Sequence, residues 1–102
     1  MTRRDLPPGL QLAQSCHALR LFAAEHPKVD EEWYRNSRYL ACLSAADEDE
    51  LIDLAHRCVD HGLRFSAYRE PDNGNQITAI AVEPGPRGRR VTSSFPLALR
   101  DV

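Results

Sequence analysis

The chain has 102 residues, 42% of them hydrophobic, and a formal net charge of −2 at pH 7. This length allows one domain, residues 1–102, and the near-neutral charge argues against a protein that coats nucleic acid through bulk positive charge. No apolar run is long enough to span a membrane and the start lacks a signal-peptide core, so we expect a cytoplasmic protein without a membrane partner.

The first predicted element is a helix from about Leu10 to Glu25. The loop Leu6-Pro7-Pro8-Gly9 precedes it, and His26-Pro27 ends it because proline disfavours helix at the preceding residue. At helical spacing the polar residues Gln14 and His17 lie opposite an apolar stripe, and we expect the helix to be covered on two sides. The residues of that stripe are Leu12, Cys16, Leu19 and Ala23.

Two further segments are predicted before the middle of the chain. Residues 29–36 indicate a short helix with Asp30 as its N-cap and Trp33 as its buried anchor. Residues 38–44 indicate a strand, and its continuously apolar centre, 39–43, predicts that both faces are covered.

The next helix carries the clearest signals in the chain. Asp47 and Glu50 have capping-box spacing, and Gly62 suits a C-terminal cap. Its apolar face is formed by Leu51, Leu54, Ala55, Cys58 and Val59.

A hairpin is predicted next. Leu63–Tyr68 alternates like a strand with one buried face, and Ile77–Val82 is continuously apolar, which favours an interior strand. Between them, Pro71–Gly74 contains Asn-Gly, a dipeptide that favours a tight turn. After an arginine-rich segment, the apolar Phe95–Leu99 is expected to dock on the body as a clasp. The alternation predicts an α/β fold, a small mixed β-sheet flanked by helices on both faces.

The cysteines Cys16, Cys42 and Cys58 are an odd number without close pairing, which fits a reducing compartment. Each has apolar neighbours, which predicts buried structural thiols. Neither Cys16-His17 nor His56 with Cys58 has the spacing of zinc ligands. We therefore expect no metal site and no cofactor.

Several short motifs in this order resemble the type 2 peptidyl-tRNA hydrolase family. The resemblance extends over most of the chain and implies that family's fold. The matching residues are Arg3-x-Asp5-Leu6, Gly9 in the loop before the helix, Ala13-Gln14-Ser-Cys-His17-Ala18, Asp72 with Gly74, and the strand Thr78–Pro84.

The resemblance implies hydrolysis of the ester that joins a peptide to tRNA, an aminoacyl-tRNA hydrolase activity that acts on the 3′ end of the tRNA. Such a reaction needs an activated water, donors for the developing oxyanion and a cation for phosphate. Asp72 would orient or activate water, Gln14 or Thr78 would donate to the carbonyl oxygen, and His17 would brace them. The candidates for substrate binding are Gly9, Asn75, Gln76, Arg3, Arg69, Arg87, Arg89 and Arg90.

The chain departs from the family pattern in ways that leave an alternative open. The family's lysine before the helix is absent from Pro7-Pro8-Gly9-Leu10, and the loop after the acidic turn is about six residues shorter. The alternative is a catalytically inactive module on the same fold that binds tRNA or protein. In that case Asp72 is only a turn residue, and Gln14 and His17 satisfy buried backbone groups.

The apolar first strand of the family is nearly absent, because the chain reads Met1-Thr-Arg-Arg. A short first strand predicts an unpaired edge with free backbone donors and acceptors. We expect either the 95–99 clasp or a second subunit in a homodimer to cover it.

Overall fold

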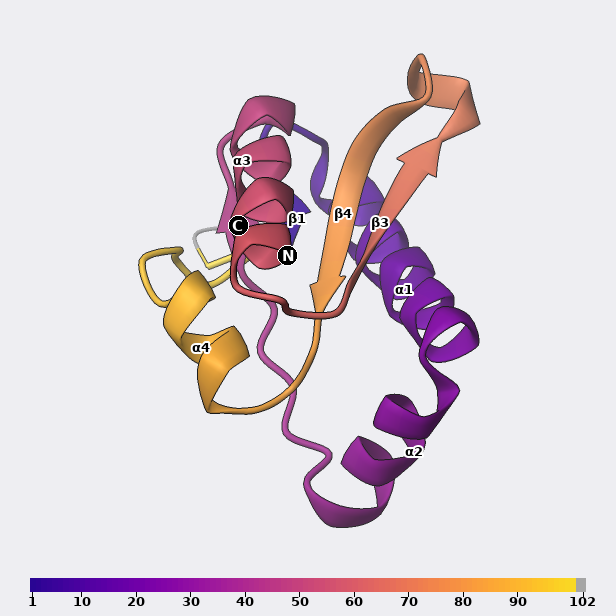
Figure 1. Ribbon diagram of the computed structural model, residues 1–102. Coiled ribbons are helices and arrows are strands. Elements are labelled where there is room, and N and C mark those ends of the chain that lie inside the picture. Colours follow the sequence, from indigo (N-terminus) through magenta and orange to yellow (C-terminus); the bar gives the residue numbers. More distant parts are fainter. Residues whose placement is uncertain (101–102) are drawn as a thin grey trace.

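A four-stranded mixed sheet in the order β2-β1-β4-β3 forms the centre of the molecule (Figure 1). The structure is a computed structural model and describes residues 1–100. Its elements are β1 (Thr2–Arg3), α1 (Pro8–Glu25), α2 (Pro27–Asn36), β2 (Ser44–Ala45), α3 (Glu48–Asp60), β3 (Phe65–Glu70), a 3₁₀ turn (Pro71–Asn73), β4 (Gln76–Val82) and α4 (Pro86–Thr92).

The hairpin of β3 and β4 is the largest part of the sheet. The two strands pair antiparallel from Phe65↔Val82 to Glu70↔Gln76, and β1 pairs with the other side of β4 at Thr2↔Ala79. The predicted hairpin and the interior position of β4 are therefore confirmed. The turn is wider than the tight Asn-Gly turn expected, because five residues, 71–75, connect the strands.

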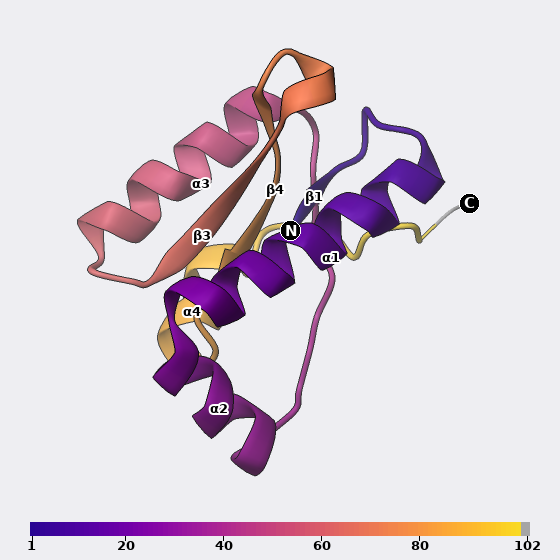
Figure 2. The same ribbon diagram turned by 90° about the vertical axis from the view of Figure 1, so that its right-hand side faces the viewer.

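Helices cover both faces of the sheet, as predicted. Helix α1 packs along β1, β3 and β4, and α3 packs on the opposite face (Figure 2). No helix within residues 1–100 is both long and apolar enough to cross a membrane.

The buried face of α1 differs from the predicted apolar stripe. Leu12 is 60% exposed and Cys16 is exposed. Two glutamines can occupy the buried face because their amides meet partners; the Gln11 Nε2 donates to the carbonyl oxygen of Leu6 at 2.7 Å. The buried residues of α1 are Gln11, Gln14, Ala18 and Phe22.

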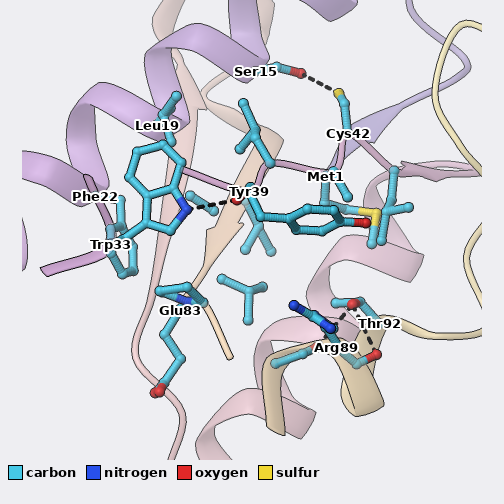
Figure 3. Close-up of a pocket in the computed structure, with 18 of the residues that line it drawn as sticks. Met1, Ser15, Leu19, Phe22, Trp33, Tyr39, Cys42, Glu83, Arg89 and Thr92 are labelled. Atoms are coloured by element: carbon cyan, nitrogen blue, oxygen red, sulfur yellow. Dashed lines mark hydrogen bonds between the residues drawn. The ribbon is translucent and has the colours of Figure 1, made fainter. Parts of the chain in front are cut away.

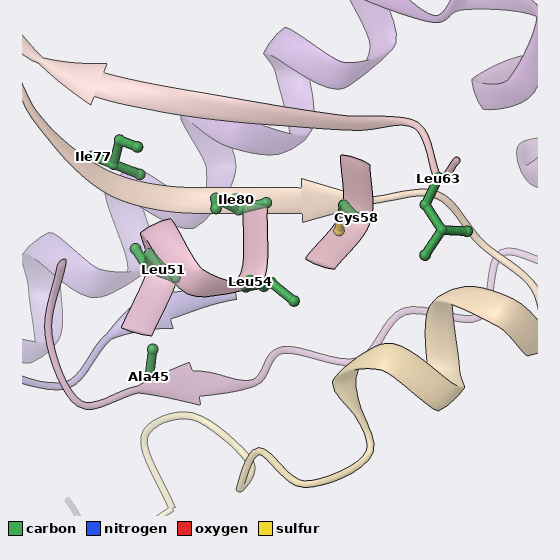
Figure 4. Packing of buried hydrophobic residues seen from close by; sticks show 7 residues of the cluster. All are labelled: Ala45, Leu51, Leu54, Cys58, Leu63, Ile77 and Ile80. Atoms are coloured by element: carbon green, nitrogen blue, oxygen red, sulfur yellow. The ribbon is translucent and has the colours of Figure 1, made fainter. Parts of the chain in front are cut away.

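Helix α3 begins and ends as predicted. The Asp47 carboxylate accepts a hydrogen bond from the Glu50 N–H at 3.0 Å, and Gly62 follows the helix with a φ of +66°. Its apolar side packs on the sheet to form the core (Figure 4). The buried members of this cluster include Leu51, Leu54, Cys58, Ile77 and Ile80.

The predicted strand over 38–44 is wrong, since β2 contains only Ser44 and Ala45. Residues 37–42 are exposed, with Tyr39 and Leu40 both at 63%. The apolar run predicted a strand, but no neighbouring strand pairs with this segment; it lines an apolar cavity instead.

Helix α2 also differs from its prediction. It begins at Pro27 with His26 at the N-cap, so Asp30 lies inside the helix rather than capping it. Trp33 is only half-buried and its Nε1 donates to the carbonyl oxygen of Tyr39 at 2.7 Å. Proline is favoured at the first helical position, which explains the earlier start.

The expected bare edge does not lie at β1 itself, because β1 lies between β2 and β4. The sheet edge on that side belongs to β2, and the 95–99 clasp covers it: Leu43 and Leu97 form a bridge and the Ser44 N–H donates to the carbonyl oxygen of Pro96. The expected clasp is thus confirmed, but on another strand. Helix α4, formed by the arginine-rich segment, was not predicted.

The cysteines fit their prediction only in part. Cys58 is buried in the core, where burial raises the pKa of its thiol, whereas Cys16 and Cys42 are exposed. The latter two lie beside the cavity next to residues 39–43, which explains apolar neighbours without burial.

Candidate functional site

Gln14 and Glu70 connect α1 to the end of the hairpin. The Nε2 of Gln14, a residue that is 1% exposed, donates to Oε2 of Glu70 at 2.8 Å. Glu70 ends β3, and its pairing with Gln76 places both side chains on the face covered by α1. The sequence analysis identified Gln14 but not its partner.

The same carboxylate also fixes the turn that follows it. Oε1 of Glu70 accepts from the backbone N–H of Asp72 at 3.2 Å. The hydrogen bond from Gln14, the one from Asp72 and the nearby charge of His17 lower the pKa of Glu70. Glu70 is therefore a carboxylate held in place by two donors and a weak base near neutral pH.

His17 lies one turn after Gln14 on α1, on the exposed surface. Its ring stacks on Tyr68 with a centroid distance of 4.8 Å and an interplanar angle of 21°. Tyr68 and Glu70 alternate along β3 and so share the α1 face of the sheet. The imidazole thus lies close to Glu70 with its edge open to solvent.

Thr78 occupies an irregularity in β4. Tyr68 pairs with Ala79 and Arg69 with Ile77, which leaves Thr78 as the extra residue of a β-bulge. Thr78 is fully buried, and among residues 1–100 neither its Oγ1 nor the Oε1 of Gln14 has a hydrogen-bond partner. Such buried polar atoms are uncommon and mark this part of the interface between α1 and β4.

Asp72 is exposed on the 3₁₀ turn, and its carboxylate has no hydrogen-bond partner in the described part of the chain. Its backbone, not its side chain, contacts the Glu70 carboxylate. The structure brings Gln14, His17 and Glu70 together. Asp72 follows Glu70 by two residues along the chain.

Arg3 connects β1 to the beginning of β4. Its guanidinium donates to Oε1 of Gln76 at 2.8 Å and to the carbonyl oxygen of Ile77 at 3.1 Å. It also forms a bidentate pair with Asp5, which lowers the pKa of that carboxyl. Arg3 and Gln76 are therefore occupied by structural contacts.

The other candidate arginines for substrate binding lie at the two ends of β4. Arg69 lies at the hairpin turn, where it is exposed and donates to the carbonyl oxygen of Asn75 at 3.2 Å. Helix α4 lies at the opposite end of β4 (Figure 1) and carries Arg87, Arg89 and Arg90. Of the candidate arginines, Arg3 and Arg69 therefore lie at the end of β4 that bears the turn with Asp72.

Gly9 lies in the first turn of α1, and a Cβ built on it would meet nothing within 4 Å. Asn75 follows the turn with a φ of +58°, and its side chain is exposed. Among the described residues, no three His, Cys, Asp or Glu side chains gather closely enough to hold a metal ion.

Glu70 and Tyr68 were not expected from the sequence to be part of this site. Side chains of a strand alternate between its two faces. A predicted strand extended beyond Tyr68 would therefore have placed Tyr68 and Glu70 on one face of β3 and Arg69 on the other. The predicted strand ended at Tyr68, two residues too early, so Glu70 was left in the turn.

A buried amide thus holds a carboxylate close to an exposed imidazole, and the turn that follows this carboxylate bears an exposed aspartate. A family model described as peptidyl-tRNA hydrolase PTH2 matches residues 2–97, whereas no curated protein matches. The match spans nearly all of the 102 residues, confirms the resemblance of the motifs, and agrees with the four-stranded α/β fold. The chain therefore belongs to the type 2 peptidyl-tRNA hydrolase family.

Proposed function

We propose that this chain hydrolyses the ester bond between peptide and tRNA in peptidyl-tRNA. The observation that supports the proposal best is the Gln14–Glu70 hydrogen bond, which joins the two segments that carry the family motifs. It links the turn that carries Asp72 to the helix that carries His17, although more than fifty residues of sequence separate the two motifs.

In this proposal Asp72 is the general base. Its carboxylate is exposed and has no donor among the described residues, whereas the carboxylate of Glu70 already accepts two hydrogen bonds. Asp72 would take a proton from water as the water attacks the ester carbonyl. It would return that proton to the ribose oxygen when the ester bond breaks, which releases the peptide as a carboxylic acid that then loses its proton to solvent.

The developing oxyanion needs a donor that the substrate can reach. The Gln14 amide nitrogen donates to Glu70, and Thr78 lies below the surface. The exposed ring of His17, held against Tyr68, is the accessible donor. Gln14 and Thr78 then act as positioning residues beneath the reacting atoms.

Substrate binding requires positive charge beside the turn. We assign this role to Arg69, because its exposed guanidinium lies next to Asn75 and has no carboxylate partner within residues 1–100. Arg3 already pairs with Asp5. A guanidinium suits phosphate well because it can donate two parallel hydrogen bonds.

An inactive binding module is the second candidate. The observation that favours it is the Asp72 side chain, which no described hydrogen bond holds in a reactive position. In this reading the surface around His17 and Arg69 binds the tRNA end without turnover.

The two candidates differ in the effect of Asp72→Asn on the rate of peptidyl-tRNA cleavage. Asparagine suits the turn as well as aspartate does but carries no charge. We expect turnover to fall about a hundredfold or more, with unchanged binding and unchanged thermal unfolding. Asp53→Asn, at an exposed aspartate of α3 on the other face of the sheet, is the matched control and should keep full activity.

A parent protein that binds peptidyl-tRNA but does not cleave it would establish the binding module instead. Equal turnover of Asp72→Asn and parent would remove Asp72 from the chemistry. A simple ester without tRNA serves as the control for nonspecific hydrolysis.

A further inference from the structure

The outer side of β3 is one of the two edges of the sheet, and we call it the β3 edge. The 95–99 clasp covers the other edge, at β2, whereas no strand within residues 1–100 pairs with the outer side of β3. The strand β4 separates the β3 edge from β1 and from the apolar cavity beside residues 39–43, whose lining includes no residue of β3 (Figure 3). The β3 edge runs instead toward the turn that bears Asp72.

Alternate residues of β3 direct their backbone groups toward the β3 edge. The Ile80 N–H donates to the carbonyl oxygen of Met1, so the backbone of Ile80 faces β1. Its partner across the hairpin, Ala67, therefore faces away from β4, and so does Arg69 two residues later. Among residues 1–100, the N–H and carbonyl groups of Ala67 and Arg69 have no hydrogen-bond partner on this outer side.

The beginning of the β3 edge is partly covered. The Nε2 of His26 lies 3.4 Å from the carbonyl oxygen of Phe65, which faces outward like that of Ala67. Arg69, at the other end, is exposed. The part of the edge that can accept a further strand is therefore formed by Ala67 and Arg69.

This part of the edge lies beside the proposed hydrolytic site. Tyr68, between the two outward-facing residues, carries the stacked ring of His17, and the turn with Asp72 begins just after Glu70. The ester of peptidyl-tRNA is formed by the C-terminal residue of the peptide. A peptide that runs along the β3 edge parallel to β3 would therefore present its ester at the end where Asp72 lies.

We propose that the peptide part of peptidyl-tRNA binds as an added strand along the β3 edge, parallel to β3. The inference rests on the proposed function, because it names how the same site holds its substrate. Peptides carried by tRNA differ in sequence but share the same backbone groups, and strand addition derives its affinity from main-chain hydrogen bonds. Such binding accepts peptides of many sequences.

Parallel pairing determines which peptide residues contact β3. In a parallel ladder, each residue that faces its neighbour bonds to two residues of that neighbour, and these alternate with residues that face away. If the last peptide residue donates to the carbonyl oxygen of Arg69, the third residue from the end bonds to both Arg69 and Ala67. The second residue from the end faces away from β3, and the ester lies just beyond Arg69.

N-methylated ligands test this register on the parent protein. The probe is a five-residue peptide of alanine and threonine joined by an amide to 3′-amino-3′-deoxyadenosine, a stable copy of the end of peptidyl-tRNA. An N-methyl group on the third residue from the end removes the donor to Ala67 and should weaken binding about tenfold or more. The same group on the second residue from the end is the matched control and should leave the affinity unchanged.

Amide hydrogen exchange locates the bound peptide. Saturating amounts of the unmodified ligand should slow the exchange of the Ala67 and Arg69 amides, because both become donors to peptide carbonyl groups. NMR of the full chain measures this exchange and the affinity in the same samples.

Ala67→Pro removes one of the outward donors from the protein side. Proline is accepted in edge strands where the N–H faces solvent, so we expect this variant to fold, which circular dichroism establishes. It should bind the five-residue ligand at least about tenfold more weakly than the parent does. A ligand with a single residue reaches only Arg69 and should bind both proteins equally. If Ala67→Pro does not fold, the two N-methylated ligands decide the question on the parent.

Three results would overturn the added strand: equal affinity of the two N-methylated ligands, no saturable binding of the unmodified ligand, or binding that leaves the exchange of the Ala67 and Arg69 amides unchanged. A parent protein that cleaves peptidyl-tRNA but gives one of these results keeps the proposed function and loses the added strand. Protection of both amides in a protein without turnover would instead support the added strand and refute the hydrolysis.

Discussion

The side-chain amide of Gln14 and the carboxylate of Glu70 form a 2.8 Å hydrogen bond between residues 56 positions apart in sequence. The donor is buried on α1, and the acceptor ends β3 just before the turn. A charge-assisted bond of this kind is stronger than one between neutral groups. It therefore anchors the turn with Asp72 to the helix that carries His17, and it gives the first prediction.

Replacing Gln14 with leucine should reduce turnover without unfolding the protein. Leucine fills a similar volume but cannot donate to Glu70, so the turn loses its anchor. We expect kcat to fall about tenfold or more with little change in KM, because misplacing a catalytic group mainly affects the chemical step. Steady-state kinetics on peptidyl-tRNA measures both quantities.

The stability of Gln14→Leu should stay within about 1 kcal/mol of the parent. The lost hydrogen bond destabilises the fold, but the substitution also removes the Oε1 atom of Gln14, which is buried without a partner among the described residues. A loss of several kcal/mol would show that Gln14 is mainly a structural residue.

The second prediction concerns the pKa of Glu70. The hydrogen bond from Gln14 is the largest cause that lowers it, so the pKa should rise in Gln14→Leu toward the ordinary value of a glutamate. Carbon-detected NMR of the Glu70 carboxyl group measures this change. Asp5, whose pKa is lowered by its hydrogen bonds from Arg3, is an internal control and should not move.

The sign of the pH effect on stability follows from the same shift. A carboxyl whose pKa is lower in the folded state stabilises the protein above its unfolded pKa, and this contribution disappears as pH falls through the folded pKa. The stability of Gln14→Leu relative to the parent should therefore rise as pH falls below about 4, because the parent loses the contribution of the charged hydrogen bond. Urea unfolding at pH 7, 5 and 3 measures it, and a relative stability of the variant that falls on acidification would contradict the assignment.

The sequence correctly predicted those elements that depend on interactions between residues close together in the chain. Asp47 and Glu50 mark the start of α3 because capping involves neighbouring residues, and the turn residues before Gly74 mark the hairpin. The family motifs located Gln14 and His17 on the first helix for the same reason.

The failed predictions involve partners that are distant in sequence. The buried face of α1 contains Gln14, whose partner Glu70 lies 56 positions away and cannot be inferred from apolar periodicity. The apolar run at 39–43 indicated a strand, but strand formation there requires a neighbouring chain that residues 1–100 do not supply. The buried face of α1 and the conformation of residues 39–43 therefore depend on the segments that lie beside them, and residue type alone does not predict them.

The third prediction separates the true core from the predicted apolar stripe. Leu54 is fully buried, whereas Leu12 is 60% exposed. Leu54→Ala should cost about 2–5 kcal/mol in the free energy of unfolding, because it leaves a cavity in the cluster packed on the sheet. Leu12→Ala should change stability by less than about 0.5 kcal/mol. Chemical denaturation compares the two, and similar costs would contradict the packing.

The fourth prediction uses two helical glycines. A Cβ on Gly88 would overlap the carbonyl oxygen of Glu83, so Gly88→Ala should force a backbone shift and destabilise the protein by about 1–3 kcal/mol. Gly9→Ala meets no atom within 4 Å and should stabilise α1 by about 0.4–1 kcal/mol. Thermal unfolding measures both, and a Gly88→Ala protein as stable as the parent would refute the close contact.

The last prediction distinguishes the two ends of β4 as sites of RNA contact. Arg69 lies beside the turn with Asp72, and Arg90 lies on α4 at the far end. Arg69→Ala should raise KM for peptidyl-tRNA roughly three- to tenfold and reduce the salt dependence of binding by about one phosphate contact. Arg69→Lys keeps the charge and should restore much of the binding. Arg90→Ala is the matched control and should behave like the parent. If Arg90→Ala weakens binding and Arg69→Ala does not, the tRNA lies along α4, and the surface around His17 and Asp72 is not where the ester is cleaved.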